Sequence, residues 1–358
     1  MKIGVFGGTF DPVHVGHLML AEAARVQAGL SQVLFMPAYI QPFKQDIQIS
    51  SDDDRIRMLN YAIQNNPNFS VNTLECDKGG ISYTIDSLRA LKEEYGEAEI
   101  SFLIGTDMFL SIEKWKDAES LIREFGFVVG VRPGYQTNEA EELAEKLKTM
   151  YGARIDFVDN PPIELSSTEI RQRIVDGNTI RYRVPEIVRI FLLTREKEGA
   201  KRFEHTKRVM DLAVDMAERF GEDKERTTIA ALLHDYCKDP AGGVENDLEH
   251  ASMAAEIAKT EFGITDEDTL NAIKYHTTGR AGMSRLERIL FLADTVEPGR
   301  TYDSITELRK TCLDDLEKGV YTVLVELKAY LVKKGLTVSK DTEEAIVDCY
   351  AGIDTGND

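Results

Sequence analysis

The first half of this 358-residue chain alternates short apolar runs with helix-like segments. The runs are rich in β-branched and aromatic residues and cover 2–8, 32–38, 69–75, 99–105, 125–131 and 154–159. Segments between them, such as 54–66 and 82–96, repeat apolar residues at helical spacing. This alternation predicts a doubly wound α/β domain, in which helices cover a parallel sheet. Ligands bind such sheets beyond the carboxyl ends of the strands.

The pattern changes after the charged segment TREKEGAKR, residues 194–202. Beyond it we find helical periodicity without a convincing strand, over 203–220, 225–236, 248–262, 267–276, 284–296 and 304–333. We therefore expect a first domain at 1–193, a linker at 194–202 and an all-α helical bundle at 203–358. The last eight residues, AGIDTGND, are expected to be frayed.

Composition narrows the classes of partner. The net charge of -19 disfavours a nucleic acid or an anionic membrane surface as the main partner. The four cysteines form no CxxC pair, which favours reduced thiols in a cytoplasmic protein. No charged-then-apolar leader and no apolar run of about 18 residues is found, so we expect a soluble protein. The sequence leaves the oligomeric state open, a homo-oligomer included.

The stretch GGTFDPVHVGH, residues 7–17, lies between the first predicted strand and an amphipathic helix. Gly7 and Gly8 allow backbone amides to approach a ligand, and the helix N-terminus attracts an anion. The lysine of a P-loop and the glycine spacing of a dinucleotide-binding turn are both missing. His14 and His17, three residues apart, can share one face of the first turn and donate to a phosphate. The motif predicts a phosphate site built on imidazoles.

A second candidate phosphate site is LSSTEIR, residues 165–171. Ser166 and Glu169 have the spacing of a capping box, so this segment predicts a helix N-terminus. Arg171, one turn into the helix, offers a planar guanidinium suited to phosphate. Cap and phosphate site are compatible, because both use the exposed amides of the helix.

Through these motifs, residues 1 to about 193 resemble the bacterial nicotinate-nucleotide adenylyltransferases of the HxGH nucleotidyltransferase superfamily. The resemblance implies a Rossmann-like sheet. The resemblance also covers, in order, PFK at 42–44, SYTIDSL at 82–88, GTDMF at 105–109, KWKD at 114–117 and VRPG at 131–134. It implies transfer of AMP from ATP, with its Mg²⁺, to nicotinate mononucleotide. Another phosphorylated acceptor, such as phosphopantetheine, is the alternative.

The resemblance also assigns residues. His14 and His17 would hold the ATP phosphates during attack on the α-phosphorus. The nucleotide would be bound by Gly7, Gly8, Thr9, Phe10, Lys44, Gly105, Thr106, Asp107, Ser166, Ser167, Thr168 and Arg171. The acceptor would be bound by Tyr83, Thr84, Trp115 and Arg132, with Trp115 stacked on the pyridine ring. From the residues alone, Trp115 could also be a core or surface residue, and Lys44 could be a solvated loop residue.

The other four histidines of the chain all fall in the helical half. With two aspartates near helix ends they form the set His205, His234, Asp235, His250, His276 and Asp294. Imidazole and carboxylate together suit a first-row metal such as iron, manganese or zinc, and Asp235 could bridge two ions. Scattered histidines without a metal are the alternative.

The order H, HD, H, HTTG, AD and EPGR resembles the HD-domain symmetrical bis(5'-nucleosyl)-tetraphosphatases over residues 203 to about 350. The resemblance implies two metal ions, iron in this family, and hydrolysis of diadenosine tetraphosphate to two ADP. One ion would be held by His205, His234, Asp235 and Asp294, the other by Asp235, His250 and His276. Lys238 and Arg300 would bind the substrate phosphates. For Arg300, an ordinary surface salt bridge is the alternative. The rival reading is a nucleotide sensor without catalysis.

Overall fold

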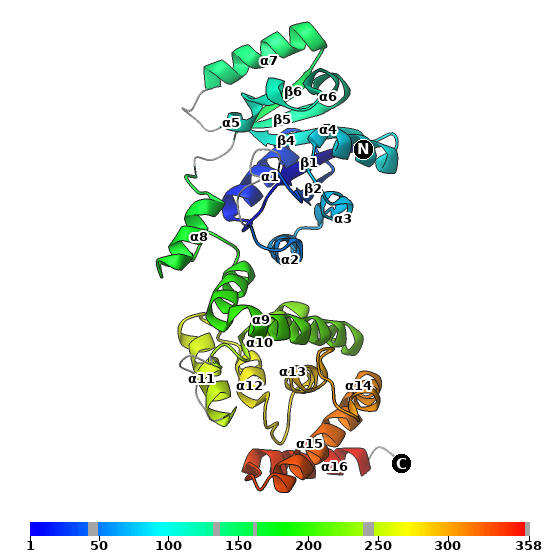
Figure 1. Cartoon of the computed structure of the whole chain (residues 1–358), viewed down its shortest axis with the longest axis vertical. Helices are drawn as coiled ribbons and strands as arrows, with labels where there is room; N and C mark the ends of the chain where they lie inside the picture. The colour runs from blue at the N-terminus through cyan, green and yellow to red at the C-terminus, as the bar shows by residue number, and fades with distance from the viewer. Residues whose placement is uncertain (42–48, 132–136, 160–162, 239–246, 355–358) are drawn as a thin grey trace. The chain divides into compact units, whose positions relative to one another are not determined.

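The computed structural model describes residues 1–41, 49–131, 137–159, 163–238 and 247–354 (Figure 1). The chain forms two compact units, Met1–Arg189 and Ile190–Asp358. The division falls a few residues before the expected boundary at 193. Residues 194–202, expected to be a linker, lie within the helical segment Glu186–Phe220, which has non-helical dihedrals at Gly199.

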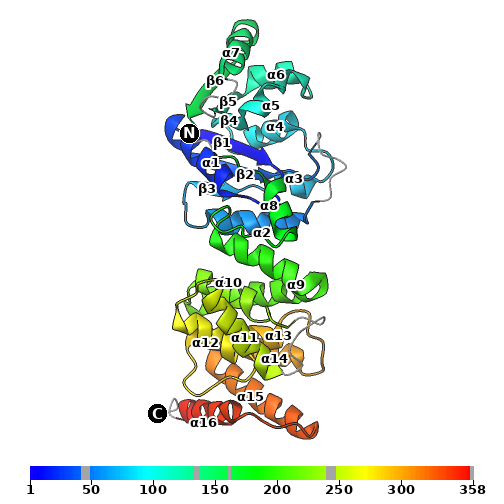
Figure 2. The same cartoon turned by 90° about the vertical axis from the view of Figure 1, so that its left-hand side faces the viewer.

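The first unit is built on a six-stranded parallel sheet, as the alternating pattern predicts (Figure 2). Its strands are β1 (Lys2–Gly8), β2 (Gln32–Pro37), β3 (Phe69–Val71), β4 (Glu99–Gly105), β5 (Gly126–Val131) and β6 (Arg154–Asp159). The strand order is β3-β2-β1-β4-β5-β6. Consecutive residues of β1, from Ile3 to Phe6, are buried, which requires cover on both faces of the sheet.

The helices of this unit are α1 (Val15–Gln27), α2 (Asp52–Ile63), α3 (Leu74–Lys78), α4 (Thr84–Tyr95), α5 (Thr106–Phe109), α6 (Ala118–Glu124), α7 (Thr137–Tyr151) and α8 (Ser167–Val175), with a 3-10 turn at Ile112–Lys114. The expected strand at 69–75 is wrong beyond Val71. Asn72 ends it, because its N–H still donates to Phe35 O of β2 while its side chain accepts from Leu74 N–H and starts α3.

The strand order reverses between β1 and β4. The chain leaves β1 toward β2 and leaves β4 toward β5, so the segments that follow these two strands diverge. A crevice therefore opens beyond Gly8 and Gly105, the last residues of β1 and β4.

In the second unit the described residues form helices only, which confirms the predicted all-α class. They are α9 (Glu186–Phe220, which begins within the first unit), α10 (Lys224–Leu233), α11 (Asp247–Thr260), α12 (Glu267–Tyr275), α13 (Arg285–Val296), α14 (Ile305–Asp314), α15 (Leu316–Lys333) and α16 (Lys340–Asp354). Helix α9 is interrupted at Gly199, where φ is 71° and ψ is 164°.

Two further expectations about this unit need correction. The single helix expected at 304–333 is two, because Asp315 adopts extended dihedrals and its side chain caps α15 by accepting from Lys318 N–H. Residues 351–354, expected to be frayed, are the last residues of α16. None of the helices in the described parts of either unit is long and apolar enough to cross a bilayer.

Candidate functional sites

The two histidines of the first motif form a reciprocal cap on α1. His14 is the N-cap, and its Nδ1 accepts from His17 N–H at 3.3 Å, while His17 Nδ1 accepts from His14 N–H at 3.2 Å. The rings stack at 3.6 Å between centroids with 18° between their planes. Because each Nδ1 accepts from the backbone, each neutral ring carries its proton on Nε2. The cap therefore turns both imidazoles into donors at Nε2.

A buried arginine supports the loop that precedes this cap. Arg55 of α2 is fully buried, and it donates to Thr9 O at 2.9 Å and pairs with Asp52 at 2.5 Å. Asp11 is also buried and accepts from Ser50 N–H at 3.1 Å. The motifs did not point to Arg55. Its signal is a charged residue on the buried side of an otherwise amphipathic helix.

A cavity of about 450 Å³ lies in front of the histidines. The predicted nucleotide-binding residues that line it are Gly8, Thr9, Phe10, His14, His17, Gly105, Thr106, Asp107, Ser166, Ser167, Thr168 and Arg171. Lys44 lies outside the described residues. The structure thus brings three segments that are far apart in the sequence to one cavity.

The N-terminus of α8 faces the same cavity and is tied to the motif loop. Ser167 Oγ donates to Pro12 O at 2.9 Å, and Arg171 Nη1 donates to Asp11 O at 2.5 Å. Ser166 Oγ accepts from Glu169 N–H, the forward half of the expected capping box. The Glu169 carboxylate is engaged elsewhere, 3.5 Å from the Arg183 guanidinium. The N-terminus of α8 and the Arg171 guanidinium therefore lie at one cavity, an arrangement suited to an anion.

A second cavity, of about 380 Å³, shares Gly8, Gln41 and Gly105 with the first. The predicted residues Gly7, Tyr83, Thr84 and Trp115 line it. Trp115 packs edge-on against Phe102 and its indole N–H donates to Ser111 Oγ at 3.3 Å. Arg132 lies outside the described residues. The two cavities meet at the carboxyl ends of β1 and β4, where a doubly wound sheet binds its ligands.

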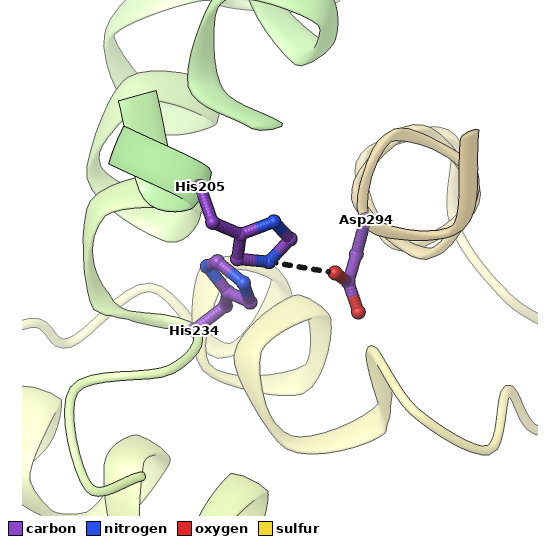
Figure 3. A group of neighbouring side chains, drawn as sticks. All are labelled: His205, His234 and Asp294. Carbon is purple, nitrogen blue, oxygen red and sulfur yellow. Dashed lines mark ion pairs between the residues drawn. The ribbon is translucent and has the colours of Figure 1, made fainter. Parts of the chain in front are cut away.

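In the second unit, the six predicted metal ligands come together from five helices or their ends. Figure 3 shows His205 of α9 and His234, just after α10, pointing toward Asp294 of α13. His205 Nε2 lies 3.1 Å from Asp294 Oδ1. The ligand atoms of these three residues all lie within 4.8 Å of one another, and so do those of His234, Asp235 and His276.

The carboxylate of Asp235 faces two sets of imidazoles. Its Oδ2 lies 3.8 Å from His234 Nε2 and 4.0 Å from His205 Nε2. Its Oδ1 lies 3.2 Å from His250 Nε2 and 3.5 Å from His276 Nε2. One carboxylate can therefore serve two positions, each with imidazole nitrogen on its other side.

The outer nitrogens of three imidazoles fix their proton positions. Nδ1 lies 2.7 Å from Ala231 O in His234 and 2.7 Å from Ile273 O in His276. A carbonyl only accepts, so these Nδ1 atoms carry the proton and Nε2 presents a lone pair. In His205, Nδ1 faces the Glu297 carboxylate at 3.2 Å.

Several inward atoms of the cluster are poorly satisfied. His234 Nε2 and Asp235 Oδ1 are buried without a hydrogen-bond partner, and the Nε2 atoms of His250 and His276 face each other at 3.3 Å. Burial lowers the pKa of His234 to about 4, so its imidazole is neutral at pH 7. Burial opposes ionisation of Asp235, but the neighbouring imidazoles hold its pKa well below the usual range. The Asp235 carboxylate acts in the other direction on His276, whose pKa it raises against the effect of burial. Imidazole nitrogens around an ionised carboxylate are the donor set of a divalent metal.

Cationic side chains surround the cluster. Arg300 pairs with Asp294 at 2.9 Å, and Lys238 lies 3.6 Å from Asp235 Oδ1. Arg202, which the motifs did not single out, lies 3.0 Å from Asp235 Oδ2. The sequence feature that could have indicated Arg202 is its position one turn before His205 on the same helix.

Comparison with known proteins assigns each unit to a recognised type. The family described as cytidylyltransferase-like matches residues 5–173, and the HD domain matches residues 202–299. The chain is 39% identical over 195 residues to a probable nicotinate-nucleotide adenylyltransferase of Moorella thermoacetica, covering 54% of this chain and 90% of that protein. It is 43% identical over 189 residues to one of Exiguobacterium sibiricum, covering 53% and 94%.

Solved structures also resemble each part. A predicted HD superfamily hydrolase involved in NAD metabolism from Clostridium acetobutylicum is 34% identical, with 46% of this chain and 96% of that chain covered and a TM-score of 0.42. A Plasmodium falciparum nicotinic acid mononucleotide adenylyltransferase complexed with NaAD is 19% identical, with 52% and 92% covered and a TM-score of 0.44. The identity and coverage of the curated relatives decide the family: this chain belongs, through its first unit, to the nicotinate-nucleotide adenylyltransferases, and it carries an HD domain in its second.

Proposed function

We propose that the first unit transfers AMP from ATP to nicotinate mononucleotide, giving deamido-NAD and pyrophosphate. The observation that carries this proposal is the pair of cavities joined at Gly8, Gln41 and Gly105. The larger cavity has imidazole, guanidinium and helix amides for a triphosphate. The smaller one has Trp115 for an aromatic ring, and the relatives named above carry this activity in their names.

The transfer needs no covalent nucleophile from the protein. The acceptor's own phosphate attacks the α-phosphorus of ATP in line, and the protein positions the two substrates. The Nε2–H groups of His14 and His17 donate to phosphate oxygens as charge builds up during transfer. Arg171 and the first amides of α8 hold the departing pyrophosphate. Mg²⁺ bound with ATP would supply charge neutralisation for the phosphates.

A substrate panel tests the identity of the acceptor. We expect kcat/KM for nicotinate mononucleotide to exceed that for nicotinamide mononucleotide by about tenfold or more, and phosphopantetheine to be inactive. The reason is the N-terminus of α4, whose first N–H groups, at Thr84 and the residue after it, suit a carboxylate better than a carboxamide. Equal values for the two mononucleotides would remove this assignment.

For the second unit we propose a phosphohydrolase with two metal ions, iron in the natural protein, that cleaves diadenosine tetraphosphate to two ADP. The two-sided environment of Asp235 carries this proposal. Its Oδ2 side, with His205, His234 and Asp294, would hold one ion, and its Oδ1 side, with His250 and His276, the other. His234 belongs to the first set because its Nε2 lies toward Oδ2. The ions would supply Lewis acidity and activation of water.

The chain's own residues then have separate tasks. Ala231 O and Ile273 O fix the proton positions of His234 and His276, and Glu297 does so for His205. Lys238 and Arg300 lie beside the ligating carboxylates, where they can bind the phosphates of the substrate.

Metal analysis and product analysis on one sample test this assignment. We expect two ions per chain and ADP as the sole nucleotide product. Formation of ATP and AMP would contradict symmetrical cleavage. Tight binding of the tetraphosphate by the metal-loaded protein without turnover would favour a sensor.

A further inference from the structure

Glu75 is a buried carboxyl group in the wall of the smaller cavity. It lies on α3, in the segment that was expected to be a strand, and its exposed fraction is 7%. Our proposed function brings the carboxylate of nicotinate into this cavity. Like charges repel at short range, so a second carboxyl here needs a structural reason.

The contacts of Glu75 provide one. Ser87 Oγ donates to Glu75 Oε1 at 2.6 Å, a bond between two buried side chains. Ser82 lines the cavity beside Glu75, and its Oγ accepts from Tyr39 N–H at 3.0 Å. The Glu75 carboxyl thus receives the hydroxyl proton of Ser87.

These two serines bracket the start of α4. Ser82 precedes Tyr83, the N-cap, and Ser87 lies in the first turn, where its N–H donates to Tyr83 O. The N-cap side chain makes no capping bond, so the turn depends on other contacts for its orientation. Glu75 holds this turn from outside the helix through Ser87, and the first residues of the turn, Tyr83 and Thr84, line the cavity.

The chemistry of the acceptor's substituent makes this orientation important. The first N–H groups of a helix have no partner within it, and a carboxylate can accept from two of them at once. A carboxamide offers one acceptor oxygen, and its NH₂ group would face N–H donors. A rigid pair of amides therefore rejects the amide substrate, whereas a mobile pair can turn away from it.

We propose that Glu75 is a positioning residue that sets the selectivity for nicotinate over nicotinamide mononucleotide, by holding Ser87 and so fixing the first turn of α4. Burial raises the pKa of Glu75, and the serine hydroxyls act against that rise. The side chains of Lys114 and Lys116 line the same cavity and offset negative charge in it. This inference rests on the proposed adenylyl transfer.

The test compares Glu75→Ala and Glu75→Gln with wild type and with Glu94→Ala, which removes an exposed carboxyl of α4. We measure kcat/KM for both mononucleotides and the KM for ATP. The selectivity ratio should fall about tenfold or more in Glu75→Ala, through the KM for nicotinate mononucleotide, with the KM for ATP unchanged within about twofold. Glu75→Gln, which keeps one acceptor oxygen, should be intermediate, and Glu94→Ala should match wild type.

Binding gives a readout that does not depend on turnover. Trp115 is the only tryptophan of the chain and lines the cavity, so its fluorescence should report both mononucleotides directly. Ser87→Ala removes the same contact from the other side and should also reduce the ratio of the two affinities. This second variant keeps the test decisive should Glu75→Ala fail to fold.

The possible outcomes separate the inference from the function beneath it. A wild-type protein that does not adenylate nicotinate mononucleotide overturns the proposed function. An active, selective wild type whose ratio survives in Glu75→Ala or Ser87→Ala overturns only the role of Glu75. A gain in kcat/KM for the acid substrate in both Glu75 variants also overturns it, because that result means charge repulsion rather than positioning.

Discussion

At the scale of single residues, the reciprocal cap of His14 and His17 decides where two protons lie. We predict that His17→Ala lowers adenylyl transfer by about 100- to 1,000-fold, the usual effect of removing a donor to developing charge. Part of the loss comes from His14, whose backbone N–H loses its acceptor. Steady-state kinetics with ATP and nicotinate mononucleotide measure it.

Hydrolysis of diadenosine tetraphosphate serves as the internal control for this variant. His17 belongs to the first unit alone, so that rate should stay at the wild-type value. Loss of both activities in a folded variant would show that the histidine pair is not confined to one reaction.

Asp235 allows a second prediction at this scale. Asp235→Ala removes a ligand from both proposed metal positions, whereas His250→Ala removes one from the Oδ1 side alone. We expect metal content to fall further in Asp235→Ala and hydrolysis to vanish in it. Elemental analysis of both purified variants measures the difference. Two ions per chain and near-native hydrolysis in Asp235→Ala would rule out the bridging arrangement.

The residues that could be predicted are those whose motif carries its own chemistry. Histidine next to aspartate, or two histidines after a glycine turn, indicates a site without knowledge of the fold. Arg55, Glu75 and Arg202 could not be found that way, because each acts through partners from another element. The role of Glu75, for instance, depends on its hydrogen bond with Ser87 of the next helix.

At the scale of elements, Gly199 interrupts α9 with dihedrals that only glycine adopts readily. A methyl group there would meet no atom within 4 Å, so the cost of substitution is conformational. We predict that Gly199→Ala lowers the free energy of unfolding by about 1–3 kcal/mol. Urea unfolding of the second unit measures this free energy. Lys201→Ala, at an exposed position close to Gly199, is the control. A variant as stable as wild type would mean that α9 straightens without loss.

Element boundaries were predictable where apolar runs have clear ends. β1, β4 and β6 begin and end at the expected residues. The errors occur where one polar side chain changes the backbone. Asn72 stops a strand and Asp315 divides a helix, yet both residues also occur inside patterns that read as regular. Hydrogen bonds to a neighbouring strand or turn determine where such an element ends. The spacing of apolar residues carries no information about these hydrogen bonds.

At the scale of the whole molecule, the two units should differ in their need for metal. In the proposed function ATP would bring Mg²⁺ to the first unit, whereas the second unit offers an imidazole-rich set that favours transition metals. We predict that chelation abolishes both activities, that Mg²⁺ alone then restores adenylyl transfer, and that hydrolysis returns only with a transition metal. Both assays on one stripped sample check this. Full recovery of hydrolysis with Mg²⁺ alone would contradict the proposed metal site.

The wall that the two cavities share, at Gly8, Gln41 and Gly105, has a consequence for kinetics. In the proposed reaction a dinucleotide product would span both cavities and leave room for neither substrate. Deamido-NAD should therefore inhibit competitively against ATP and also against nicotinate mononucleotide. Pyrophosphate, which we propose binds at the N-terminus of α8, should compete with ATP alone. Product inhibition patterns would thus show, without any further structure, that the two cavities form one continuous site.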